Sequence, residues 1–134
     1  MADAVTSQTL VDNQTTAIML FTNISDGPGE SLVTKVNVAN LAANALGQAC
    51  TGVSVQKIHT ACHGMEVRMF WGASSNVFFF GTAQNSQFTF DLSNFGGLVN
   101  NAGAGKTGNI LFSTADQTLG DTYTIILEMK KYYN

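Results

Sequence analysis

Apolar and polar residues alternate along several short stretches of this chain, which is the period of a β-strand with one face in a core. The clearest stretch is the last, Asp121 to Lys131. The side chains expected on its inward face are Tyr123, Ile125, Leu127 and Met129. Ile126 breaks the alternation, so we expect it to contact a second layer or a partner. Thr15 to Ile24 is apolar on both faces and β-branched, which also predicts a strand.

An aromatic block from Phe70 to Phe90 holds seven of the thirteen aromatic residues. Two breaks rich in turn-forming residues, at 72–76 and 81–86, predict three strands joined by two turns. Val77 to Phe80 is apolar on both faces and is predicted to be a central strand covered twice. The side chains expected to be buried in the core are Trp71, Phe79, Phe88, Phe90, Ile125 and Leu127.

The remaining segments predict further strands and loops. Val53 to Ala61 and Met65 to Trp71 resemble a hairpin that turns at residues 62–64, with a β-bulge near Gln56. Strands are also expected over residues 31–39 and 109–114. Residues 40–52 fit either one or two helical turns or a structured loop, and residues 94–108 form the longest expected loop.

About eight strands, frequent turns and little helix predict an all-β fold, an antiparallel β-sandwich or a jelly roll. The 134 residues are expected to form one domain, 1–134, with an N-terminal arm over about residues 1–6. A chain of this length buries about two-thirds of its unfolded surface and needs no disulfide or metal to hold its core.

The surface is expected to be weakly charged, because charged residues make up only 11% of the chain and the net charge is −3. Nucleic-acid binding needs clustered lysines and arginines, so we expect no nucleic-acid partner. The longest apolar run, Ala17 to Phe21, is too short to span a bilayer, and no signal peptide is visible. We therefore expect a soluble protein made in the cytoplasm, with no membrane partner and a surface suited to contact with other proteins.

Four residues could in principle bind zinc. They are Cys50, His59, Cys62 and His63. Structural zinc sites usually present paired ligands two to four residues apart, whereas Cys62 and His63 are adjacent and would point to opposite faces of a strand. We expect no metal site and two free, buried thiols.

Other catalytic patterns are incomplete. Residues 103–107 (GAGKT) resemble a phosphate-binding loop, but Asn100 occupies the place of its first glycine and a strand, not a helix, is expected to follow. Neighbours such as Cys62 and His63 rarely form a nucleophile and its base. Asp26 and Glu30, the nearest pair of carboxylates in a loop, are expected to be solvated. The sequence thus predicts no catalytic residue, no cofactor and no enzyme.

Four segments are similar to a pattern in small structural proteins of tailed bacteriophage virions. They are residues 26–36 (DGPGESxVTKV), 49–53 (ACTGV), 95–108 (FGGLxNNAGAGKTG) and 121–128 (DTYTIILE). These proteins are virion components without an assigned activity. The resemblance implies a capsid decoration (cement) protein that binds the major capsid protein outside the shell, and a homotrimer. It also implies a location in the virion after synthesis in the host bacterial cytoplasm.

Two other functions remain open. One is a structural position in the neck, tail or baseplate, and the other is a carbohydrate-binding β-sandwich for host-surface recognition, which exposed aromatic residues in the 72–76 or 95–101 loops would favour. For a capsid decoration protein, and equally for a neck, tail or baseplate protein, segments that order poorly alone are expected to contact neighbouring subunits. The predicted interface residues are Val5, Leu10 and Val11 near the N-terminus and Asn100, Asn101 and Lys106 in the glycine-rich loop.

Overall fold

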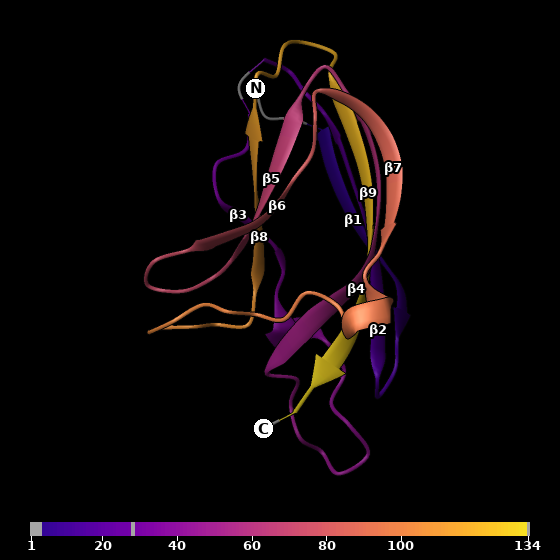
Figure 1. Ribbon diagram of the computed structural model, residues 1–134, viewed down its shortest axis with the longest axis vertical. Helices are drawn as coiled ribbons and strands as arrows, with labels where there is room; N and C mark the ends of the chain where they lie inside the picture. The colour runs from indigo at the N-terminus through magenta and orange to yellow at the C-terminus, as the bar shows by residue number, and fades with distance from the viewer. Residues whose placement is uncertain (1–3, 28, 134) are drawn as a thin grey trace.

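The structure, a computed structural model, describes residues 4–27 and 29–133. Within these residues the chain forms nine β-strands and two 3-10 turns and no α-helix, which confirms the predicted all-β fold (Figure 1). The strands are β1 (Ala4–Asp12), β2 (Thr16–Ile24), β3 (Val33–Val36), β4 (Gly52–His63), β5 (Glu66–Trp71), β6 (Val77–Gly81), β7 (Asn85–Asp91), β8 (Ile110–Ala115) and β9 (Thr122–Tyr132). The turns are η1 (Val38–Asn40) and η2 (Ser93–Phe95).

The strands form two antiparallel sheets that pack face to face (Figure 1). One sheet has the order β1-β2-β9-β4-β7 and the other has the order β3-β8-β5-β6. If β1 is set aside, the two four-stranded sheets have the strand order of a jelly roll, in which two Greek keys wrap into a sandwich. The strand β1 is therefore an addition at one edge of a jelly-roll frame.

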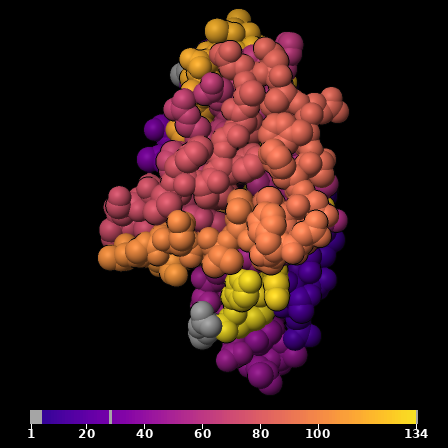
Figure 2. All heavy atoms as spheres, viewed as in Figure 1, coloured from indigo at the N-terminus to yellow at the C-terminus, as the bar shows by residue number. Residues whose placement is uncertain are grey.

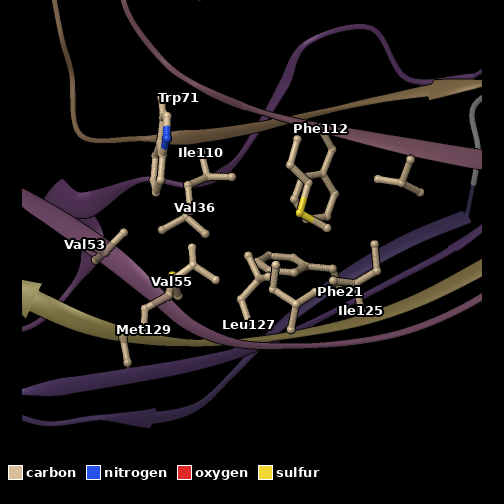
Figure 3. Close-up of a cluster of buried hydrophobic side chains, with 14 of the residues drawn as sticks. Phe21, Val36, Val53, Val55, Trp71, Ile110, Phe112, Ile125, Leu127 and Met129 are labelled. Carbon is tan, nitrogen blue, oxygen red and sulfur yellow. The ribbon is translucent and has the colours of Figure 1, made fainter. Parts of the chain in front are cut away.

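The core lies between the sheets and is built from side chains that alternate along the strands. In β9 the four predicted inward residues are all buried, and in β5 Trp71 is buried as predicted, together with Val67 and Met69 on the same face. Phe21 of β2 and Phe112 of β8 meet edge to face from opposite sheets, with ring centroids 5.2 Å apart (Figure 3). The burial of these hydrophobic side chains between the sheets is the main contribution to the stability of the fold.

The predicted β-bulge in β4 is confirmed. The pairing of β4 with β9 shifts register between Val55 and Lys57. The extra residue resets the alternation, so that Val53 and Val55 before it and Ile58 after it are all buried although their spacing is uneven.

The predicted hairpin of β4 and β5 is wrong. β4 pairs with β9 and β7, whereas β5 pairs with β8 and β6 in the other sheet. The turn between them uses Gly64 with φ of 87°, and the Gly64 N–H donates to Asn85 Oδ1 at 3.1 Å. This turn carries the chain across the sandwich instead of reversing it within one sheet. A hairpin within one sheet and a crossing to the other sheet give the same alternation of apolar and polar residues along each strand. The sequence pattern alone therefore could not distinguish the two arrangements.

The prediction that β6 is a central strand is also wrong, because β6 is an edge strand of the four-stranded sheet. Phe79 stacks on Trp71 with ring centroids 4.1 Å apart, so one face of the strand packs on the core. On the other face Phe78 is 53% exposed and meets Phe70 edge to face at 5.7 Å. The apolar residues on both faces therefore reflect aromatic pairs at an edge, not coverage by a second layer.

The predicted core residues of β7 are less buried than expected. Phe88 is half-buried, and Phe90 is 45% exposed, so its predicted burial is wrong. β7 is an edge strand, and its aromatic side chains close the margin of the sandwich rather than its centre. Phe80 of β6 lies 5.3 Å from Phe90 and 6.1 Å from Phe88, measured between ring centroids.

Three other segments differ from the sequence-based expectation. From Ala4 on, the expected N-terminal arm is the edge strand β1, whose pairing with β2 begins at Ala4 opposite Ile24; residues 1–3 lie outside the described residues. The strand expected over residues 31–39 is limited to β3, because η1 follows it at once. Residues 41–51 form the loop alternative and not helical turns, with the Asn44 N–H donating to the Gln48 carbonyl at 3.0 Å.

Candidate interaction surfaces

The first group of predicted interface residues lies on β1, the outer strand of the five-stranded sheet. Val5, Leu10 and Val11 are 46%, 45% and 37% exposed. Among the described residues β1 pairs with β2 alone, so its other edge carries backbone N–H and C=O groups without a strand partner. The pairing with β2 shifts register between Thr9 and Val11, which makes Leu10 a bulge residue.

One end of β1 is fixed firmly by a buried lysine. The side chain of Lys131 in β9 has no exposed surface, and its ammonium donates to Asp12 Oδ1 at 2.6 Å, to the Asn13 carbonyl at 2.8 Å and to the Ala42 carbonyl at 2.7 Å. These three acceptors satisfy all three donors of the ammonium. The contact joins the β1–β2 turn, the 41–51 loop and β9 at one point.

The second group lies in the glycine-rich loop between η2 and β8. This loop is docked on its own domain by the backbone. Leu98 and Val55 exchange two hydrogen bonds of 2.8 and 3.0 Å, the Ser74 N–H donates to the Ala104 carbonyl at 3.1 Å, and the Thr107 N–H donates to the Gly72 carbonyl at 3.0 Å. The loop does not depend on a neighbour for these contacts.

Side chains of the glycine loop remain available at the surface. Asn101 and Lys106 are exposed, and Lys106 takes part in no ion pair among the described residues. Asn100 is half-buried, and its Oδ1 accepts a hydrogen bond from the Ala102 N–H at 2.9 Å, so the amide nitrogen is the group that it can offer to a partner.

A hollow of about 340 Å³ lies between the glycine loop and the C-terminal end of β9. In Figure 2 the orange loop lies directly above the yellow end of the chain. The described residues that line this hollow are Thr51, Gly52, Val53, Val99, Asn100, Lys106, Gly108 and Tyr132. They include one cation and no carboxylate, so the hollow is suited to a partner that carries negative charge. We call it the loop hollow.

A close backbone approach shapes the loop hollow. Gly108 has φ of 84°, and a Cβ at this position would lie 2.3 Å from the Thr51 carbonyl oxygen. Only glycine fits this conformation and this distance. The glycine therefore lets the loop turn back against the start of β4 and form one wall of the hollow.

The structure does not bring the two predicted groups together. β1 is an edge of the five-stranded sheet, whereas the glycine loop is bonded to the β5–β6 turn of the other sheet and to β4. In Figure 1 the indigo β1 lies on the right of the molecule and the orange loop extends to the left. The two predicted groups therefore lie on different elements and form two separate surfaces.

Sequence reasoning missed a polar cluster on the outer face of the five-stranded sheet. His59 Nε2 lies 2.6 Å from Glu128 Oε2, and its Nδ1 lies 3.1 Å from Thr89 Oγ1. The cluster borders a shallow hollow of about 410 Å³ that Gln87, Thr124 and Ile126 also line. The outward position of Ile126 agrees with its break in the alternation. The cluster is invisible in the sequence because it depends on the register of three strands.

The cysteine and histidine candidates do not form a metal site or a nucleophile. No group of three or more potential metal-ligand side chains gathers among the described residues. Cys50 and Cys62 are free and buried; Cys50 lies in the loop two residues before β4, and Cys62 lies near the other end of β4, on the order of 30–40 Å away at about 3.3 Å per residue. Burial raises the pKa of the Cys62 thiol, although its hydrogen bond with Thr82 opposes this, so the thiolate is disfavoured. His63 is exposed, on the opposite face from Cys62.

The remaining candidates have structural surroundings. Residues 103–107 are followed by β8 and not by a helix, so they lack the helix N-terminus of a phosphate-binding loop. The expectation that Glu30 is solvated is wrong. Its side chain is only 8% exposed, it is paired with Lys35, and it accepts hydrogen bonds from the Tyr123 hydroxyl at 2.6 Å and from Asn23 Nδ2 at 2.9 Å.

Comparisons with known proteins add no relative: no protein-family model matches the chain, and no curated protein matches it in sequence. No helix among the described residues is long and apolar enough to cross a membrane.

Proposed function

We propose that the protein is a non-enzymatic structural component of a bacteriophage particle and that it decorates the outside of the capsid shell. The observation that carries this proposal is the pair of separate exposed surfaces on one small domain, the β1 edge and the loop hollow. A decoration protein needs one surface for the shell and can use a second for other copies of itself. Many copies held at both surfaces gain avidity that one small interface does not provide.

Three further observations support this proposal. Segments of the sequence resemble phage virion proteins, the charged fraction of the chain is low at 11%, and the fold is a jelly-roll sandwich. Jelly rolls are common in viral capsid domains, although they also occur in lectins and cupins, so the fold alone does not define the function.

We assign the loop hollow to the major capsid protein. Lys106 is the cation in its lining, Asn100 supplies an amide group there, and the exposed Asn101 follows Asn100 in the chain. An acidic side chain of the shell would pair with Lys106, and the low net charge of the rest of the surface would leave this contact to set the orientation.

The test is binding to purified capsids that lack this protein. Lys106→Glu should reduce binding at least tenfold, because it reverses the one charge in the loop hollow. Lys57→Glu is the matched control, since Lys57 lies on β4 outside both surfaces, and it should bind as the unaltered protein does.

Two results would contradict the proposal. One is binding of the unaltered protein that is no stronger than that of an unrelated β-sandwich. The other is a copy number of about five to twelve in purified virions, which follows from the symmetry of a neck or tail and not of a shell. Hundreds of copies per virion are expected for decoration.

A second candidate, recognition of host-surface carbohydrate, is favoured by one observation. Phe95 in η2 is 67% exposed and lies in the loop region where an exposed aromatic residue would favour this function. Aromatic rings offer an apolar face on which a sugar ring can stack. Binding of the protein to polysaccharide extracted from the host surface, lost on Phe95→Ala and retained on Lys106→Glu, would favour this candidate over decoration.

A further inference from the structure

The outer edge of β1 lacks the features that normally keep a sheet edge from pairing with another chain. The strand has nine residues, and no charged residue or proline occurs from Val5 to Val11. Natural edge strands are usually short, charged, interrupted by proline or covered. The protective features here are Asp12 at the end of the strand and the bulge at Leu10, which leaves the six residues before it, 4–9, in regular pairing with β2.

The other three edges of the sandwich are better protected. β3 has only four residues and contains Lys35, and β6 has five residues and ends at Gly81. β7 is longer and, like β1, ends at an aspartate, but its margin is filled by the contact of Phe80 with Phe90. β1 is therefore the edge most open to strand addition among the described residues.

β1 also extends beyond the opposing sheet. Ser7 and Val5 lie opposite Phe21 and Asn23 of β2, which are both buried, so this side of β1 faces inward. Nevertheless Val5, Ser7 and Thr9 are exposed, because the opposing sheet has one strand fewer and ends at β3. A second chain can therefore approach the edge of β1 without displacing any strand of this domain.

We propose that β1 pairs in antiparallel fashion with β1 of a second copy of this chain. The two five-stranded sheets then join into one continuous ten-stranded sheet about a twofold axis. The partner is identified by the self-complementary sequence of the regular stretch Val5–Thr9. With Ser7 on the axis, Val5 faces Thr9 of the second copy, Thr6 faces Gln8, and Ser7 faces Ser7.

Each of these cross-strand pairs is favourable or neutral. Val5 and Thr9 are both β-branched, a type that packs well across a sheet, and the two Ser7 hydroxyls can hydrogen-bond to each other. The stretch carries no charge, so antiparallel self-pairing opposes no like charges. This inference does not depend on the capsid role, and it replaces the homotrimer that the resemblance implied with a dimer.

The register can be tested by an intermolecular disulfide. In antiparallel pairs directly opposite residues have Cβ atoms about 4.5–5.5 Å apart, close enough for a disulfide after a small adjustment. Ser7→Cys should therefore give a covalent dimer under mild oxidation. The natural Cys50 and Cys62 are buried and should not react. Ser75→Cys, in the exposed β5–β6 turn, is the matched control and should remain a monomer on a non-reducing gel.

A second pair of variants tests the association itself by sedimentation equilibrium. Ser7→Lys places two ammonium groups opposite each other on the axis and should weaken the dimer at least tenfold, whereas Ser75→Lys should leave it unchanged. Circular dichroism verifies that both variants keep the β-sheet spectrum. A monomer at the highest soluble concentration of the unaltered protein would overturn the proposal. A dimer unaffected by Ser7→Lys, or one that Ser7→Cys does not cross-link, would place the contact elsewhere and equally overturn it.

Discussion

On one margin of the sandwich, β6 and β7 meet through the rings of Phe80, Phe88 and Phe90. On the other margin, β1 extends past β3, and its inward-facing residues remain in contact with water. Both margins are formed by edge strands of the same two sheets. The first is closed by side chains of the chain itself, and the second is left open at the level of one subunit.

The closed margin contributes to the stability of the monomer, whereas the open margin is available for association with a partner. Aromatic rings packed between β6 and β7 contribute to the free energy of folding of the monomer, since they are partly removed from water there. The apolar residues of β1 contribute little to it, because Val5 and Leu10 stay 46% and 45% exposed. What β1 offers instead is an uncharged strand edge, which becomes stabilising only when a partner covers it.

The largest effect is expected where β1 is anchored. Lys131→Met should reduce the free energy of unfolding by about 3–5 kcal/mol, because it removes the buried partner of Asp12 and leaves two backbone carbonyls without a donor. Urea unfolding measures it. A loss below about 1 kcal/mol would mean that the end of β1 is as weakly held as its middle, and that β1 is a detachable arm.

The pH dependence of the unfolding free energy tests the Lys131 contact independently. Burial alone lowers the pKa of Lys131, but hydrogen bonds and charge interactions with Asp12 and Tyr133 outweigh it, so the folded-state pKa lies above the ordinary 10.5. Because the folded-state pKa is raised, the stabilisation is fully present below the ordinary value and is lost as the pH rises through the folded-state pKa. The difference in unfolding free energy between the unaltered protein and Lys131→Met should therefore shrink at strongly alkaline pH.

A smaller loss is expected at the closed margin. Phe80→Ala should cost about 2–3 kcal/mol, less than the 3–5 kcal/mol typical of a fully buried phenylalanine, since Phe80 is only partly buried. Thermal unfolding monitored by circular dichroism gives the comparison with Phe78→Ala, which removes a more exposed ring of the same strand and should cost less. Equal losses for the two variants would show that the rings between β6 and β7 do not close the margin.

Local patterns predicted the strands well. The alternation in β9 identified its buried residues, and the uneven spacing in β4 located its bulge, because both depend on neighbours within one strand. Which strands pair with each other was harder to predict from the sequence, since the turn at Gly64 could equally reverse the chain within one sheet or carry it to the other sheet. Phe90 was placed in the core because aromatic residues usually occupy it, but β7 is at an edge, where a ring can be half exposed and still pack.

The candidate surfaces could be predicted only in part. The absence of charge between Val5 and Val11 is visible in the sequence, but the exposed edge depends on β1 adding to β2 outside the jelly-roll frame. The loop hollow requires the return of the glycine loop to the start of β4, and the bond between His59 and Glu128 joins residues 69 positions apart. Neither arrangement has a local sequence signal.

The smallest effect is expected at Leu10, on the open margin. Leu→Ala in a core costs about 2–5 kcal/mol, but Leu10 is a bulge residue that is 45% exposed, so Leu10→Ala should cost less than about 1 kcal/mol. The measurement belongs in the Ser7→Lys background, because a dimer would add its own association free energy to the apparent stability. Leu127→Ala, at a fully buried position of β9, is the matched control and should lose several times more. A loss of about 2 kcal/mol or more for Leu10→Ala would mean that its own chain already covers the β1 margin, and no edge would then remain for a second copy.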